Sequence, residues 1–361
     1  MTIDQLMAFA VAQGAADLYV QTGTLPRLRV DGLVREVDSP PLTDEQVRSF
    51  IRAIGPRAVV EDIDAHMTRG ADFSYELGGR SRFRCNLYSH LGAPGLVIRV
   101  IPTAIPTFDR LHLPAVVADV VAERRGLTLL SGATGSGKSS TLAAMVDWLN
   151  NHHHIKILTI EDPVEFVHAP KKSLITHVEV GGDTPSFEQG LRQAVRQAPD
   201  VILVGELRDA ETVRMALRAA DTGHQVLATI HSANAAQTVK RLLALAPPGE
   251  VAIAREQLAA SLVGVIAQRL ARSKAGGLWP VVEVMRGDAV TSKLILEDRL
   301  GELADYVATG QKGMRTFDRD ILDLHRRGIL AEAEALRVAT NRDAVAFGMR
   351  VEEHGIPKPA G

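Results

Sequence analysis

The octapeptide GATGSGKS, residues 132–139, has the composition of a loop that binds phosphate groups. It matches the pattern G-x-x-x-x-G-K-[ST] and lies between an apolar run that predicts a strand and an amphipathic run that predicts a helix. Backbone N–H groups of such a loop bind phosphates, Lys138 adds positive charge at the β and γ positions, and the Ser139 hydroxyl can ligate Mg²⁺. A glycine-rich turn without a ligand is the alternative, but strand, loop and helix are all in place. The expected phosphate-binding residues are Gly132, Ala133, Thr134, Gly135, Ser136, Gly137, Lys138, Ser139 and Ser140.

Two glutamates follow apolar runs that predict buried strands: Glu161 follows IKILTI, and Glu206 follows VILVG. In open α/β sheets, ligands bind at the carboxyl ends of strands. Mg²⁺ offsets the repulsion between carboxylates and phosphates, and an attacking water needs an acceptor. We therefore expect both glutamates and Ser139 near the metal, with Glu206 as the general base or water-positioning residue and Glu161 holding a metal-bound water. Asp162 and Glu165 also follow the run IKILTI. The sequence does not decide between a functional role and a structural one, which would be a turn position for Asp162 and a solvated side chain for Glu165.

His231 follows the apolar run QVLATI, at another expected strand end. It could sense a γ-phosphate or contact a neighbouring subunit, and the alternative is a buried structural histidine. His224, before the same run, leaves both interpretations open. The run at 152–154 follows an expected helix, where histidines suit the negative end of the helix dipole. No spacing here indicates zinc.

Arginines occupy every second position in RSRFRCN from residue 80 to residue 84. Strand periodicity places Arg80, Arg82 and Arg84 on one face and Ser81, Phe83 and Cys85 on the other. A row of guanidinium groups of this kind is either a solvated sheet face or the source of an arginine finger that acts across a subunit interface.

Composition bounds the class of protein. The chain has 361 residues, of which 46% are hydrophobic and 23% charged, with a formal net charge of −2. This length suits two domains and a third small unit, and the charge gives no indication of a nucleic-acid partner. Cys85 is the single cysteine, which excludes an internal disulfide and a cysteine-based zinc site. The first residues lack a basic segment, and no apolar run approaches about 18 residues, so we expect a cytoplasmic protein.

The elements that position these residues form an α/β chain with several parts. Residues 1–100 predict a smaller α+β domain, and the proline-containing segment 101–114 predicts an extended linker. Residues 115–289 alternate apolar runs with helices, which is typical of a buried, mainly parallel sheet, and residues 290–361 predict helices. The expected strands of the larger domain are LTLLSG, IKILTI, VILVGE, QVLATIH and WPVVEVM. The expected helices are 186–198, opened by a Ser186–Gln189 capping box and stopped by Pro199, 209–221 and 235–246.

Several long motifs in this order resemble those of one family. They are ADLYVQTGTLPRLRVDG, GATGSGKSS, ILTIEDPVEFVH, RQAPDVILVGELRDAET and TGHQVLATIHSANAAQTVKRLL. The chain resembles the type IV pilus retraction ATPases of the PilT and PilU kind, within the type II/IV secretion ATPases. The resemblance implies a PAS-like N-terminal domain, a RecA-like ATPase domain and a homo-hexameric ring with ATP and Mg²⁺ bound between subunits. It also implies docking on an inner-membrane platform protein at the cytoplasmic face of the pilus machine, where hydrolysis removes pilin subunits and drives twitching motility.

The resemblance assigns roles by position. Lys138 and Ser139 bind phosphates and Mg²⁺, Glu206 is the catalytic glutamate, Glu161 assists, and His231 belongs to the histidine box. The arginine candidates are Arg82, Arg84 and Arg99. Pilus-extension and type II secretion ATPases usually carry a four-cysteine zinc element, so a chain with one cysteine fits the retraction branch.

One segment departs from the family pattern. Retraction ATPases carry a C-terminal Ala-Ile-Arg-Asn-Leu-Ile-Arg-Glu element, and VTSKLILE at 290–297 has neither arginine. This departure favours an accessory, PilU-like role beside a second retraction ATPase. Two other classes stay open at this point: a RecA-like nucleic-acid translocase, and a structural ring subunit that binds nucleotide without turnover.

Overall fold

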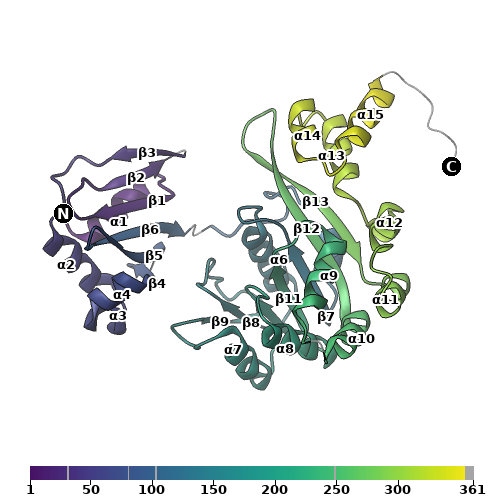
Figure 1. The fold of residues 1–361 in the computed structure, drawn as a ribbon, viewed down its shortest axis with the longest axis horizontal. Coiled ribbons are helices and arrows are strands. Elements are labelled where there is room, and N and C mark those ends of the chain that lie inside the picture. Colours follow the sequence, from purple (N-terminus) through teal and green to yellow (C-terminus); the bar gives the residue numbers. More distant parts are fainter. Residues whose placement is uncertain (31, 80, 102–103, 248, 354–361) are drawn as a thin grey trace. The chain divides into compact units, whose positions relative to one another are not determined.

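The computed structural model describes residues 1–30, 32–79, 81–101, 104–247 and 249–353 (Figure 1). The described chain divides into two compact units. The first comprises Met1–Ala104 together with Pro163–Val167, and the second comprises Ile105–Asp162 and the described chain from His168 onward.

The first unit, purple in Figure 1, is an antiparallel sheet with helices packed against it. Its strand order is β3-β2-β1-β6-β5-β4. The strands are β1 (Asp17–Gln21), β2 (Arg27–Val30), β3 (Leu33–Glu36), β4 (Ala71–Leu77), β5 (Ser81–His90) and β6 (Ala93–Ile101). The helices are α1 (Ile3–Ala12), α2 (Asp44–Ile54), α3 (Arg57–Glu61) and α4 (Ile63–Arg69). The apolar faces of these helices and strands pack into one core. This core contains the buried side chains of Leu6, Leu18, Ile51 and Phe83.

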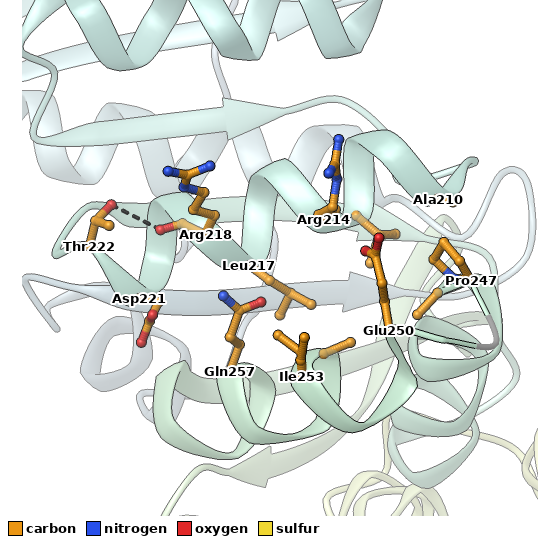
Figure 2. Close-up of a pocket in the computed structure, with 13 residues that line it drawn as sticks. Ala210, Arg214, Leu217, Arg218, Asp221, Thr222, Pro247, Glu250, Ile253 and Gln257 are labelled. Atoms are coloured by element: carbon orange, nitrogen blue, oxygen red, sulfur yellow. Dashed lines mark hydrogen bonds between the residues drawn. The ribbon is translucent and has the colours of Figure 1, made fainter.

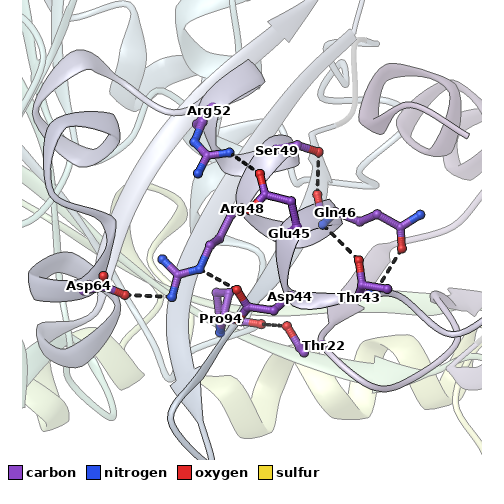
Figure 3. Close-up of polar contacts among 10 residues, drawn as sticks. All are labelled: Thr22, Thr43, Asp44, Glu45, Gln46, Arg48, Ser49, Arg52, Asp64 and Pro94. Carbon is purple, nitrogen blue, oxygen red and sulfur yellow. Dashed lines mark hydrogen bonds and ion pairs between the residues drawn. The ribbon is translucent and has the colours of Figure 1, made fainter.

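Helix α2 shows how local sequence fixes an element (Figure 3). The Gln46 N–H donates to Thr43 Oγ1 at 3.2 Å and the Thr43 N–H donates to Gln46 Oε1 at 2.9 Å, which is a complete capping box. Arg48 then pairs with Asp44 at 2.6 Å within α2 and with Asp64 of α4 at 2.8 Å. Helix α2 therefore begins at a capping box, and Arg48 links it to α4.

The second unit is built on a sheet with the order β13-β12-β7-β11-β10-β8-β9. All pairings are parallel except that of β12 with β13. The strands are β7 (Gly126–Ser131), β8 (Lys156–Glu161), β9 (Leu174–Glu179), β10 (Val201–Val204), β11 (Gln225–Ile230), β12 (Leu262–Arg272) and β13 (Leu278–Arg286). The predicted strands of this domain are all present, and the mixed α/β fold class is confirmed.

In this second sheet, sequence reasoning missed two strands, β9 and β12. Helix α10 ends at Ser261 and β12 begins at Leu262 without an intervening loop. No turn residue separates them, so an apolar run of this length reads as a continuation of the helix. The bulge between Leu262 and Gly264 lets the chain enter the sheet beside β7.

Helices cover this sheet. They are α5 (Val116–Val121), α6 (Lys138–His152), α7 (Phe187–Ala194), α8 (Ala210–Asp221), α9 (Ala235–Leu245) and α10 (Val251–Ser261). Helix α7 ends earlier than predicted, because Val195–Gln197 form a 3₁₀ turn and Ala198 has a φ of 50°. Pro199 disfavours the α conformation at the preceding residue, which explains the early end. Ser186 caps α7 by accepting from the Gln189 N–H at 3.2 Å, which is the serine half of the predicted capping box.

The segment predicted as an extended linker, 101–114, is held by aromatic contacts in its second half. The Phe108 ring stacks on Trp148 with centroids 6.4 Å apart, and the His112 ring stacks on Trp279 at 3.7 Å. Residues 102 and 103 lie outside the described residues. From Ile105 the chain therefore folds as part of the second unit.

The C-terminal region, green to yellow in Figure 1, is helical as expected. Its elements are α11 (Ala289–Leu296), α12 (Leu303–Ala308), the 3₁₀ turn Gln311–Gly313, α13 (Phe317–Arg326), α14 (Glu332–Val338) and α15 (Arg342–Glu353). Phe317, Ile321 and Leu324, which lie on one face of α13, are buried against the β12–β13 hairpin. Partly buried Glu283 of β13 accepts from the Ala235 N–H at 2.8 Å and the Phe317 N–H at 3.4 Å, where α9 and α13 begin. Among the described helices, none combines the length and the apolar character that crossing a membrane requires.

Candidate nucleotide-binding and catalytic site

The loop between β7 and α6 adopts a conformation that requires glycine. Gly132 and Gly137 have φ angles of 150° and 89°. A Cβ at Gly132 would lie 2.4 Å from the Gln268 carbonyl oxygen, and one at Gly137 would lie 2.7 Å from Gln268 Nε2. Residue Gln268 belongs to strand β12, which sequence reasoning missed, so this strand packs directly against the loop. Only glycine fits at these two positions without displacing Gln268.

Polar groups of this loop suit an anion. Gly137 is the N-cap of α6, and among the described residues no side chain caps this helix, so the N–H groups of its first turn are available to a ligand. The hydroxyls of Ser131 and Ser136 are buried without a hydrogen-bond partner among the described residues. Lys138 Nζ donates to the Gly132 carbonyl at 3.0 Å and the Ala133 carbonyl at 2.9 Å. A phosphate group would satisfy these donors, which is the chemistry expected of residues 132–140.

Sheet order brings Glu161, Glu206 and His231 to one edge of the sheet, beside the P-loop. Strands β7, β11, β10 and β8 are consecutive neighbours in the sheet and run parallel. The P-loop follows β7, His231 follows β11, Glu206 follows β10, and Glu161 ends β8. The four motifs therefore converge at the carboxyl ends of adjacent strands, although they are spread over about 100 residues of sequence.

Glu206 lies in a network of direct contacts. Its side chain is 16% exposed, and its carboxylate contacts His231 Nε2 at 3.3 Å and Arg208 at 2.7 Å. On its other side, His231 Nδ1 lies 3.3 Å from the Gly132 carbonyl oxygen. The hydrogen bond to Glu206 raises the pKa of Arg208. His231 thus links the carboxylate to the P-loop, and Arg208 is a member of the site that sequence reasoning did not select, although it stands two residues after Glu206.

Glu161 lies beside His177 of β9. The distance from His177 Nδ1 to Glu161 Oε1 is 3.9 Å, and the two side chains are 18% and 17% exposed. Strand β9 was not predicted, so no feature of the sequence indicated that this histidine would lie beside Glu161.

The arginine candidates belong to the first unit, whereas the P-loop and both glutamates belong to the second. Phe83 and Cys85 are fully buried, which confirms the predicted alternation along β5, and Arg82 and Arg84 take the other face. Arg84 lies 3.6 Å from Asp72, and Arg99 pairs at 2.9 Å with the buried Asp17. Arg99 therefore has a structural partner within its own unit, and Arg80 lies outside the described residues.

His224 and His152 have local partners. His224 Nδ1 lies 3.0 Å from the Ala219 carbonyl oxygen at the end of α8, and His152 Nδ1 lies 2.7 Å from the Trp148 carbonyl oxygen at the end of α6. These contacts support the structural interpretation for both residues. In the described part of the chain, no group of three or more His, Cys, Asp or Glu side chains could hold a metal ion.

A separate pocket of about 310 Å³ lies between α8 and α10 (Figure 2). Leu217 and Ile253 point toward one another in it, and Arg214, Arg218 and Glu250 stand at its rim. None of the residues predicted for nucleotide chemistry lines this pocket. It is therefore distinct from the site at the strand ends.

The fold and the site define a P-loop ATPase with a RecA-like sheet, in which a glycine-rich loop and two carboxylates lie at the ends of neighbouring strands. The chain belongs to the type II/IV secretion system protein family, whose model matches residues 1–298. The resemblance to ATPases of the PilT and PilU kind is confirmed by the relatives described next.

The chain is 42% identical over 336 residues to the type IV pilus retraction ATPase PilT of Pseudomonas aeruginosa, with 93% of this chain and 97% of the relative covered. It is 34% identical to the type IV pilus ATPase PilU of the same organism, with 93% and 88% covered. A crystal structure of the pilus retraction motor PilT with bound ADP is similar over 96% of this chain and 99% of that chain, with a TM-score of 0.89 and 33% identity.

Proposed function

We propose that this chain is a motor ATPase that couples ATP hydrolysis to retraction of type IV pili. One observation supports this most: the P-loop, Glu161, Glu206 and His231 converge at one sheet edge in a chain similar to PilT along nearly its whole length. The similarity extends through both compact units, so it includes the unit without the P-loop. A nucleic-acid translocase would need a basic, stacking-competent surface, which a chain with 4% aromatic residues and a net charge of −2 does not indicate.

The site residues divide the hydrolysis reaction among them. The N–H groups of the P-loop and Lys138 bind the β- and γ-phosphates. Glu206 orients the attacking water and accepts its proton, the water oxygen bonds to the γ-phosphorus, and the bond from that phosphorus to the bridging oxygen of ADP breaks. His231, in contact with both Glu206 and the Gly132 carbonyl, holds the carboxylate in register with the phosphate loop.

The residues present also fit Mg²⁺. A serine hydroxyl at the first turn of α6 and a carboxylate at the end of β8 are hard oxygen donors, and Mg²⁺ in nucleotide sites is completed by phosphates and waters. Ser139 would ligate the ion directly, and Glu161 and Glu206 would hold its waters. When bound, the ion neutralises charge that develops on the phosphate oxygens.

The assembly proposed is a homo-hexamer in which Arg82 or Arg84 reaches the nucleotide of a neighbouring subunit. A guanidinium group stabilises the transition-state charge of phosphoryl transfer, and both residues lie on the face of β5 opposite the buried Phe83. We place the ring in the cytoplasm against an inner-membrane platform protein, where it removes pilin subunits from the fibre base.

The sequence of α11 supports a role as an accessory retraction ATPase that works beside a second one. Letter by letter, Ser292 and Leu296 stand where the family element has arginines, and Leu296 is 50% exposed. Lys293 keeps one charge, 3.9 Å from Glu297, but an ammonium cannot reproduce the planar, bidentate contacts of a guanidinium group. Because the P-loop and both glutamates are intact, hydrolysis should persist while mechanical output weakens.

Two experiments test these proposals. Phosphate release by the purified protein, with and without nucleic acid, should show ATP hydrolysis that nucleic acid does not stimulate. Strong stimulation would favour a translocase, and no release would favour a structural ring subunit. Expression as the only retraction ATPase in a pilus-competent cell should give poor twitching, and full twitching would refute the accessory role.

A further inference from the structure

The register of β8 and β9 places a histidine on the same face as Glu161. The two strands are parallel, with Thr159 opposite His177 and Glu161 opposite Glu179. Residues two apart on a strand point to the same face, so Thr159, Glu161 and His177 share one surface of the sheet. Glu179 adds a second carboxylate to this surface.

The imidazole of His177 is held at both ring nitrogens. The His168 N–H donates to Nε2 at 3.1 Å, and Nδ1 lies 2.9 Å from Thr159 Oγ1. A nitrogen that accepts from a backbone N–H carries no proton, so the hydrogen-bond network assigns the proton of the neutral ring to Nδ1. That N–H donates to the Thr159 hydroxyl and presents its positive end to Glu161 Oε1, 3.9 Å away.

Burial makes this arrangement rigid. Thr159 is 1% exposed and His168 is 5% exposed, and the rings of His168 and His177 stack with centroids 5.8 Å apart. Burial lowers the pKa of His168 to about 4, so its ring is neutral near pH 7. The ring of His177 therefore packs against an uncharged neighbour, and its orientation depends on two hydrogen bonds rather than on an ion pair with His168.

We propose that His177 is a positioning residue for Glu161, which acts by restricting the Glu161 carboxylate to the orientation needed at the nucleotide. This inference rests on the proposed role of Glu161 in hydrolysis. His177 does not touch the phosphates; it acts through the carboxylate. Its loss should therefore affect turnover more than nucleotide binding.

The experiment compares three substitutions in the full-length protein. His177→Leu removes both hydrogen-bonding nitrogens, and we expect kcat for ATP hydrolysis to fall about tenfold while KM for ATP changes less than about threefold. His177→Gln offers an oxygen to the His168 N–H and an NH₂ group to Thr159 and Glu161, so it should restore most of kcat. Thr159→Val removes the hydroxyl that orients Nδ1 and should reproduce the effect of His177→Leu. Affinity for fluorescent ADP and the thermal unfolding midpoint of each variant separate positioning from loss of fold.

A double-mutant comparison decides whether His177 acts through Glu161. If it does, Glu161→Gln/His177→Leu should lose no more activity than Glu161→Gln alone. Additive losses would overturn the inference, and so would a normal kcat in His177→Leu, or a kcat in His177→Gln as low as that in His177→Leu at unchanged unfolding midpoints. Full turnover in Glu161→Gln would instead overturn the proposed role of Glu161 itself, so the two failures are distinguishable.

Discussion

At the scale of single residues, the proposed binding and catalytic roles fall on different strand ends. Lys138 belongs to the loop proposed to bind phosphates, whereas Glu206 stands at the end of another strand and contacts His231 and Arg208. Arg208 and His231 both bear on the Glu206 carboxylate, so its position depends on neighbours from two different strand ends. A substitution should therefore be able to impair nucleotide binding or hydrolysis separately.

Lys138→Ala should abolish tight ATP binding, because the positive charge at the β- and γ-phosphates is lost. Glu206→Gln should bind ATP normally but lose turnover by about 100-fold or more, because an amide cannot accept the proton of the attacking water. Fluorescent-nucleotide binding beside steady-state phosphate release measures both. Glu332→Gln, at an exposed position of α14, is the matched control. Near-normal turnover in Glu206→Gln would remove this residue from the catalytic role.

At the scale of elements, β12 decides the shape of the P-loop. Buried Gln268 accepts from the Thr141 hydroxyl at 2.8 Å. Its carbonyl oxygen lies against Gly132 at the start of the loop, and its side-chain amide lies against Gly137 at the end. This strand therefore supports both the loop and the first turns of α6.

Gln268→Ala should destabilise the fold by about 1–3 kcal/mol, because the Thr141 hydroxyl is left buried without its acceptor. It should also weaken ATP binding, since the support below Gly137 is lost. Urea unfolding and nucleotide titration measure the two effects. Adding Thr141→Val removes the unpaired hydroxyl and should recover part of the stability but not of the binding. Equal stability of Gln268→Ala and the wild type would contradict this account.

The C-terminal helices contain a buried acid that makes stability depend on pH. Asp320 accepts from the Val282 N–H at 2.8 Å and pairs with Arg315, yet burial raises its pKa to about 6. The folded state therefore holds this proton more tightly than the unfolded state, whose pKa is about 4. The contribution of Asp320 to stability is largest below about pH 4 and is lost as the pH rises through 6. The test is the free energy of unfolding of the wild type minus that of Asp320→Asn, measured at each pH. This difference should fall by about 2 kcal/mol between pH 4 and 7. A flat difference would show that the pKa of Asp320 is not raised.

At the scale of the whole molecule, the arginine row and the P-loop lie in different compact units. Family membership and similarity to PilT extend through both units, which supports a function that needs both. The proposed ring makes a direct test possible, since each site would then draw residues from two subunits.

Mixing inactive Arg82→Ala/Arg84→Ala subunits with inactive Glu206→Gln subunits should restore part of the hydrolysis, because mixed interfaces pair an intact glutamate with intact arginines. Phosphate release across a series of mixing ratios measures it. Arg27→Ala, which removes an exposed arginine paired with Glu36, should leave hydrolysis unchanged and serves as the control. Mixtures that never exceed the sum of the separate proteins would refute action in trans.

The sequence by itself determined the phosphate loop, the strand-end acids and the family. These signals are local: a glycine loop between a strand and a helix, and carboxylates directly after apolar runs, need no knowledge of distant residues. The strands β7, β8, β10 and β11 were predictable for the same reason.

Only the tertiary structure decided which residues support this chemistry. Gln268 meets Thr141 across 127 positions of sequence, and His177 reaches Glu161 only because the β8–β9 register sets it opposite Thr159. Strand β12 was hidden because it continues α10 without a turn residue, and the apolar periodicity of a short run does not separate helix from strand. Contacts of this kind depend on strand order and register, which are fixed by packing of the whole sheet rather than by any local segment.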